Sequence, residues 1–104
     1  MGYVYLICDP SNDSFKIGVT KKDIKERIKK LQTGNCEELF IASYYEYEYP
    51  YRLEKMLHAK FSDKRLQGEW FKLSSNDIGQ FRTICQELSN IIESLKNNPF
   101  VSLK

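Results

Sequence analysis

The sequence predicts a small α+β domain in which a three-stranded antiparallel sheet is flanked by helices and followed by a C-terminal helix. Three observations predict this class. Two alternating strand-like segments stand at the N-terminus with a cluster of turn residues between them, which is typical of a hairpin. Apolar residues at helical spacing mark the segments that follow. The 104 residues leave room for one core, so we expect residues 1–104 to form a single domain.

The N-terminal hairpin is expected from a strand at residues 2–8, a turn at 9–13 and a second strand at 15–20. If Ile7 faces Lys16, then Tyr5 faces Gly18, and the side chains of Tyr5 and Lys16 lie on the same face of the sheet. Gly18 has no side chain, so it would leave open space opposite the Tyr5 ring.

A helix is predicted at about residues 20–32, a strand at 39–47 and a second helix at 51–63. A turn with a short extended stretch follows at 67–73, and a final helix at 75–97. Thr20 is the expected N-cap of the first helix, and Ser74 or Ser75 that of the last. Glu54 and His58 stand four residues apart and therefore share a side of the second helix, at the border of the core.

Arg27 falls within the apolar stripe of the first helix, where an arginine needs a polar partner because an unpaired buried charge is costly. The last helix also has an apolar stripe, with alternating steps of three and four residues: Ile78, Phe81, Cys85, Leu88, Ile92 and Leu95. We expect that stripe to pack on the sheet. The same spacing would suit a helical seam, so a homodimer through the C-terminal helix is a second interpretation.

Basic residues are concentrated near the first helix. Residues 16–30 contain seven cations and two acids, a local charge of +5 in a chain whose net charge is +2. The lysines of this block that would contact phosphates without reading sequence are Lys21, Lys22, Lys25, Lys29 and Lys30. A solvated lysine-rich helix face gives the same pattern.

Several classes are excluded by composition. No apolar run approaches the roughly 18–20 residues of a membrane span, and the N-terminus enters strand-like sequence without the regions of a signal peptide. Three well-separated cysteines and one histidine do not supply the four ligands of a structural zinc site. Cysteines without a pairing pattern suit reducing conditions, so we expect a cytoplasmic, intracellular protein.

The hairpin carries a resemblance to a known family. The triplets at residues 3–5, Tyr-Val-Tyr, and 16–18, Lys-Ile-Gly, resemble the Gly-Ile-Tyr and Tyr-Ile-Gly of the GIY-YIG nuclease superfamily. A hydroxyl residue, a helical arginine and a glutamate on a later helix follow in the family's order, at Thr20, Arg27 and Glu54.

Four further segments look like the small stand-alone, phage-associated branch of that superfamily, at residues 15–20, 31–35, 53–58 and 68–71. The resemblance covers a core at residues 2–73, and the final helix lies outside it. There are two departures: Tyr3 replaces the first glycine, and Lys16 replaces the tyrosine that catalytic members use.

The resemblance implies a metal-dependent endonuclease that hydrolyses the phosphodiester bonds of DNA. Tyr5 would then be the general base or orient the attacking water, and Lys16 on the same face would stabilise its phenolate. Arg27 would clamp the phosphate, and His58 would assist proton transfer. Glu54 would hold one Mg²⁺ or Mn²⁺ ion.

Two other functions stay open. A nucleic-acid-binding module that has lost catalysis through Lys16 is the main alternative, and a protein-interaction domain that uses the terminal helix is the third. Structural roles are also open for single residues: Arg27 would pair with Glu54, while Trp70 and Phe71 would either close the core or stack on a splayed base.

Overall fold

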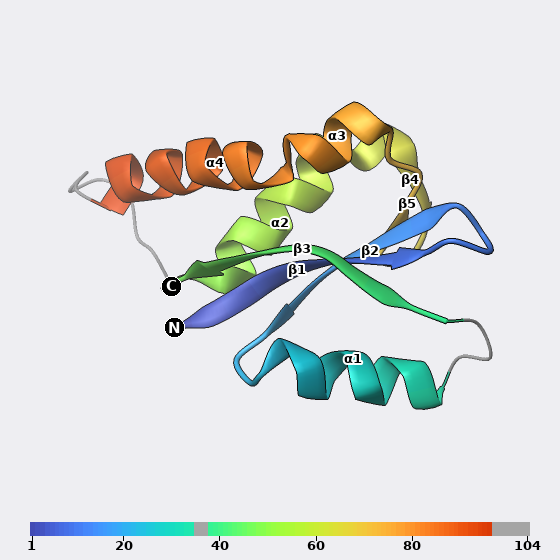
Figure 1. The fold of residues 1–104 in the computed structure, drawn as a ribbon. Helices are drawn as coiled ribbons and strands as arrows, with labels where there is room; N and C mark the ends of the chain where they lie inside the picture. The colour runs from blue at the N-terminus through green and yellow to red at the C-terminus, as the bar shows by residue number, and fades with distance from the viewer. Residues whose placement is uncertain (35–37, 97–104) are drawn as a thin grey trace.

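The computed structural model describes residues 1–34 and 38–96, so residues 35 and 97, which end two of the segments named above, lie outside it. The elements in chain order are β1 (Gly2–Asp9), β2 (Ser14–Thr20), α1 (Ile24–Thr33), β3 (Phe40–Tyr47), α2 (Pro50–Lys60), a 3₁₀ turn (Ser62–Lys64), β4 (Arg65–Gln67), β5 (Trp70–Phe71), α3 (Ser75–Gly79) and α4 (Phe81–Lys96). Helix α1 covers one face of the sheet, and α2, α3 and α4 lie on the other (Figure 1). Within the described ranges, none of these helices has both the length and the apolar character needed to cross a lipid bilayer.

The sheet is larger than predicted. Over the described residues it has five antiparallel strands in the order β3-β1-β2-β5-β4, where the sequence predicted three. The two additional strands have three and two residues, which is too short for an alternating pattern to be recognised. The predicted extended stretch after the turn becomes β5, and it pairs with the free edge of β2.

The predicted register of the hairpin is confirmed, with Tyr5 opposite Gly18 and Ile7 opposite Lys16. Strand β3 pairs with the other edge of β1, so β1 lies between β3 and β2 and its residues from Val4 to Ile7 have no exposed surface. Alternate side chains of β1 therefore enter two different cores.

The larger core lies between the sheet and α2 and α4, and includes Val4, Leu6, Ile17, Leu53, Leu57, Phe71 and Phe81. The smaller core lies under α1, and consists of Tyr5, Ile7 and Leu39 with Ile28, Leu31 and Trp70 packed against them. Tyr5 thus belongs to the α1 face, whereas the residues on either side of it face α2.

The predicted N-cap of the first helix is wrong. Helix α1 begins at Ile24 and is capped by Asp23, whose Oδ1 accepts from the Lys25 amide at 2.9 Å. The Thr20 hydroxyl instead accepts from the Lys22 amide at 3.1 Å, which supports the turn after β2. The second helix ends at Lys60 rather than at residue 63, and a separate 3₁₀ turn follows.

The predicted single C-terminal helix is two helices, α3 and α4, which meet at Gln80. Gly79, the last residue of α3, has a low helix propensity and favours a break there. In α4 the side chains of Phe81, Cys85 and Ile92 are buried in the larger core, as predicted for a stripe that packs inside the fold. Dimerisation through this helix stays a prediction.

Asp77 fixes the start of α3. Its Oδ2 accepts from the Lys64 ammonium at 2.6 Å and from the Ser74 amide at 2.9 Å, while its own amide donates to the Ser74 hydroxyl at 3.1 Å. This capping box confirms Ser74 as the N-cap. The Lys64 contact, followed by the Ser74 amide, lowers the pKa of Asp77 below its ordinary value.

We predict that Asp77→Asn lowers the free energy of unfolding at neutral pH by about 1 kcal/mol or less, as expected for an accessible ion pair. Because the pKa of Asp77 is lower in the folded state, its stabilisation is present above the unfolded-state pKa and is lost as pH falls through the folded-state pKa. Urea unfolding curves of the two proteins should therefore converge in acid. The exposed Asp63 provides the matched control, Asp63→Asn, and a deficit of Asp77→Asn that persists in acid would contradict the assignment.

Candidate functional site

Tyr5 lies over Gly18 on the α1 face of the sheet. Its side chain has no exposed surface, and a Cβ atom added at Gly18 would lie 2.3 Å from the Tyr5 hydroxyl oxygen and 2.4 Å from Cζ. A glycine is therefore required opposite this ring. The space that the sequence predicted beside Gly18 is filled by Tyr5 itself.

Arg27 reaches this hydroxyl from α1. Its Nε donates to the Tyr5 oxygen at 3.3 Å, and this hydrogen bond is the main cause that raises the pKa of the guanidinium above its ordinary value. The polar partner that Arg27 needs is therefore Tyr5. Among the described residues Arg27 forms no ion pair with Glu54, the structural alternative considered from the sequence.

Glu54, His58 and Glu69 form a compact group. Glu54 and His58 lie one turn apart on α2, Glu69 lies in the turn between β4 and β5, and one ligand atom of each lies within 4.8 Å of the others. The Oε2 atom of Glu54 is buried and accepts no hydrogen bond from any residue that the structure describes. Burial, and then the charge of Glu69, raise the pKa of Glu54 above its ordinary value. A buried carboxylate oxygen without a partner beside a second carboxylate favours a cation at this position.

The orientation of His58 is set by the edge of β2. Its Nε2 lies 2.9 Å from the carbonyl oxygen of Ile17 and its ring packs edge-on against Phe71, with centroids 5.0 Å apart. A carbonyl oxygen only accepts, so Nε2 carries the hydrogen and Nδ1 keeps its lone pair. A histidine held in this way by a backbone carbonyl is suited to metal binding through its other nitrogen.

The edge of β2 is open at this point because its pairing with β5 ends at Lys16. The next residue, Ile17, donates its amide to the Glu69 carbonyl at 3.1 Å and offers its own carbonyl to His58. The β4–β5 turn and α2 thus supply the partners that a further strand would otherwise provide, and they bring Glu69 and His58 together.

Lys16 does not contact Tyr5, although both lie on the α1 face. Its ammonium forms an ion pair with Glu69 Oε2 at 2.8 Å and lies 5.6 Å from the centroid of the Trp70 ring. Among the described residues the cation that contacts the Tyr5 hydroxyl is Arg27, and stabilisation of a Tyr5 phenolate by Lys16 stays a prediction. Glu69, a carboxylate from the neighbouring strand pair, attracts the Lys16 ammonium more strongly than a neutral phenol does.

Glu69 connects the two groups of side chains. It is in contact with Lys16, its charge raises the pKa of Glu54, and the same charge acts on Arg27. Glu69 was not among the predicted site residues, although the segment at residues 68–71 was part of the resemblance. Its role depends on the pairing of β5 with β2, which no spacing in the sequence shows.

The predicted phosphate-binding lysines lie exposed around the start and outer face of α1. Lys21, Lys22 and Lys30 line a cavity of about 410 Å³ together with Arg27. Lys21 and Lys22 also line a second cavity of about 500 Å³, which Lys25 completes, and Lys29 is exposed on α1. Of the two aromatic residues offered for base stacking, Phe71 is fully buried and Trp70 packs on the smaller core, so both close the fold.

We predict that Gly18→Ala lowers the free energy of unfolding by about 1–3 kcal/mol, because the new methyl group overlaps a buried ring. Gly79→Ala is the matched control: an added Cβ there meets no atom within 4 Å, and a helical alanine should leave stability unchanged or raise it by up to about 1 kcal/mol. Urea unfolding of both variants checks the difference in sign. A Gly18→Ala protein as stable as the wild type would show that the ring is not held against β2.

A family model described as the T5orf172 domain matches residues 2–86. The match extends beyond the residues 2–73 that carry the resemblance and into α4, whose Phe81 and Cys85 complete the larger core. Neither the curated proteins nor the solved structures contain a significant match to the chain. The family model covers more than half of the sequence, and the chain therefore belongs to the T5orf172 domain family.

Proposed function

We propose that this chain is a metal-dependent endonuclease of the GIY-YIG type, from its small phage-associated branch, that hydrolyses phosphodiester bonds of DNA. The observation that carries the proposal is the group formed by Glu54, His58 and Glu69 at the open edge of β2, next to the Tyr5–Arg27 pair. Membership of the T5orf172 family and the basic surface around α1 support it.

The residues of the group fit a divalent cation. A carboxylate oxygen of Glu54, a ring nitrogen of His58 and a carboxylate oxygen of Glu69 lie within 4.8 Å of one another, and Oε2 of Glu54 accepts no hydrogen bond from a described residue. Carboxylates suit Mg²⁺ and Mn²⁺, and the imidazole favours Mn²⁺ over Mg²⁺. Such an ion would supply a Lewis acid that polarises a phosphate oxygen. His58 would then be a ligand, in place of the proton-transfer role that the resemblance implied.

The chain's own residues would bind and orient the substrate. Arg27 uses Nε for the Tyr5 hydroxyl, which leaves its terminal nitrogens for a phosphate. The Tyr5 hydroxyl accepts from Arg27, and the guanidinium would stabilise negative charge that develops on the phenol oxygen. Lys16 would position Glu69 through their ion pair.

Binding of nucleic acid without hydrolysis is the second candidate function. The 2.8 Å ion pair favours it, because Lys16 already neutralises one of the two carboxylates that a cation needs. In that case the lysines and Arg27 would still bind phosphates, and the affinity would fall steeply with salt.

We predict that the protein nicks plasmid DNA when Mg²⁺ or Mn²⁺ is present, and that Glu54→Gln and Tyr5→Phe each lower the rate by about 100-fold or more. The first change removes a ligand charge, and the second removes the hydroxyl that Arg27 binds. Glu87→Gln, an exposed glutamate on α4, is the matched control and should keep the wild-type rate. Cleavage that survives both site variants would dismiss the site. Salt-sensitive DNA binding without cleavage would establish the second candidate.

A further prediction concerns the ion itself. Mn²⁺ should raise the thermal stability of the wild type by mass action, by about 2.7 kcal/mol at an ion concentration of 100 times Kd. The loss of the free Mn²⁺ signal in electron paramagnetic resonance reports the binding directly. Glu54→Gln and Glu69→Gln should each weaken it, and Glu87→Gln should not. A weakening by Glu54→Gln alone would remove Glu69 from the proposed centre.

A further inference from the structure

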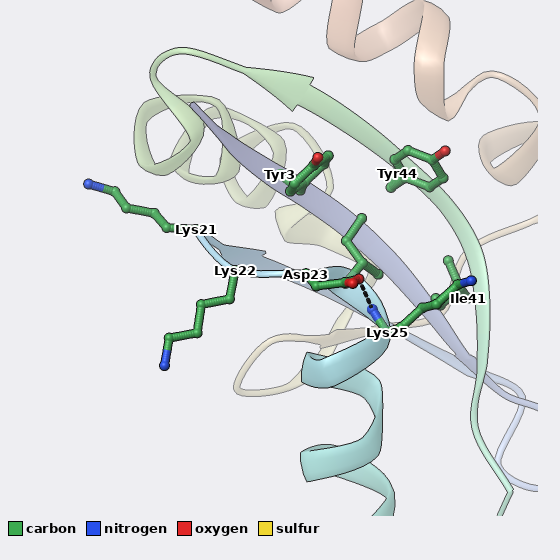
Figure 2. Close-up of a pocket in the computed structure, with 8 residues that line it drawn as sticks. Tyr3, Lys21, Lys22, Asp23, Lys25, Ile41 and Tyr44 are labelled. Atoms are coloured by element: carbon green, nitrogen blue, oxygen red, sulfur yellow. Dashed lines mark hydrogen bonds between the residues drawn. The ribbon is translucent and has the colours of Figure 1, made fainter.

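A cleft beside the candidate site is lined by exposed aromatic and apolar side chains. Tyr3 of β1 and Tyr44 of β3 pack edge to face, with ring centroids 6.1 Å apart and planes at 70°. Tyr44 is 46% exposed, and Ile41, on the same strand, is 36% exposed. Figure 2 shows both tyrosine rings and Ile41 around the start of α1, where Asp23 and Lys25 complete the wall. The cavity measures about 500 Å³, within the usual range of small-molecule sites.

This cleft adjoins the candidate site along the sheet. Tyr44 pairs with Tyr5 across β1 and β3, and Tyr5 pairs with Gly18 across β1 and β2. The exposed ring of Tyr44 therefore lies one strand away from the ring whose hydroxyl binds Arg27, at a strand spacing of about 4.8 Å.

Basic side chains lie along the surface between the Tyr3–Tyr44 cleft and Arg27. Lys21 and Lys22 line both the Tyr3–Tyr44 cleft and the Arg27 cavity, and Lys25 stands at the wall of the cleft. A strip of surface thus extends from the rings of Tyr3 and Tyr44, past Lys21 and Lys22, to the guanidinium of Arg27. Proteins that bind single-stranded nucleic acid combine these features, since aromatic rings stack on bases while cations follow the phosphates.

The arrangement does not suit the bases of an intact duplex, which are stacked on one another and closed to a side-chain ring. Only an unpaired or splayed base can enter a pocket and stack on a tyrosine. An unpaired nucleotide would place its base against the exposed ring of Tyr44 and its phosphates toward the shared lysines.

We infer that the Tyr3–Tyr44 cleft binds an unpaired base of a DNA strand whose backbone runs toward Arg27, so that the protein selects single-stranded or unpaired DNA over fully paired duplex. The inference rests on the proposed function for the choice of DNA, and it adds the structural class of the substrate. The ring of Tyr44 is the stacking surface, and the lysines are phosphate contacts that do not read sequence.

Fluorescence anisotropy with a labelled oligothymidylate and a blunt duplex of equal length tests the inference, in buffer with a chelator so that no cleavage occurs. The wild type should bind the single strand more tightly than the duplex. Tyr44→Ala and Tyr44→Leu should each weaken single-strand binding by about tenfold, because stacking on one base is lost, and Tyr44→Phe should retain it. Phe40→Ala is the matched control: Phe40 is 49% exposed on the same strand but does not line the cleft, so its loss should leave binding unchanged.

Unchanged binding by Tyr44→Ala, or tighter binding of the duplex by the wild type, would overturn the inference. Retained binding by Tyr44→Leu would show that the cleft accepts any apolar group and would overturn it as well. So would a dimeric wild type that Tyr44→Ala converts to monomers in sedimentation, since the cleft would then join two copies of the chain. Binding that depends on Tyr44 in a protein that never cleaves DNA would reject the endonuclease and leave the cleft assignment standing.

Discussion

The buried ring of Tyr5 occupies the space that Gly18 leaves on β2, and this contact determines how the α1 side of the molecule is built. Because the ring lies over Gly18 of the neighbouring strand, its hydroxyl is within reach of α1, and Arg27 binds it. A larger residue opposite Tyr5 would displace its ring. Among the described residues, the Tyr5 phenol is what connects the smaller core to the Arg27 guanidinium. The fold and the candidate chemistry thus share one packing constraint.

The second constraint is the incomplete pairing of β2. Strand β5 pairs with it at two positions only, and the backbone of Ile17 beyond them is bound by Glu69 and by His58. Backbone groups at a sheet edge need partners, and here the partners are residues with ligand atoms of their own. A short edge strand therefore has a consequence for chemistry: it leaves room for α2 to bring a histidine and a buried carboxylate beside the turn that carries Glu69.

Charge connects these regions. Glu69 interacts with Lys16, Glu54 and Arg27. Loss of its ion pair with Lys16 would therefore change the electrostatic environment of both Glu54 and Arg27. Lys16 pairs with one of the two nearby carboxylates and so reduces the repulsion between them. The surface around α1 adds further cations, and it leads from the exposed ring of Tyr44 to Arg27. The proposed binding surface and Arg27 would therefore lie on the α1 face, and the Glu54–His58–Glu69 group at the edge of β2, beside α2 (Figure 1).

The sequence by itself determined the hairpin with the opposition of Tyr5 and Gly18, the second helix with Glu54 and His58 on one side, and a helical cap at Ser74 or Ser75, of which the structure uses Ser74. These features depend on contacts between residues close in the chain, where alternation and helical spacing are sufficient. Only the tertiary structure decided that Arg27 binds Tyr5, that Lys16 binds Glu69, that Glu69 joins Glu54 and His58, and that Tyr3 and Tyr44 form a cleft. Those contacts join separate elements and depend on which strand borders β2 and which borders β1, and local sequence patterns carry no information on that order.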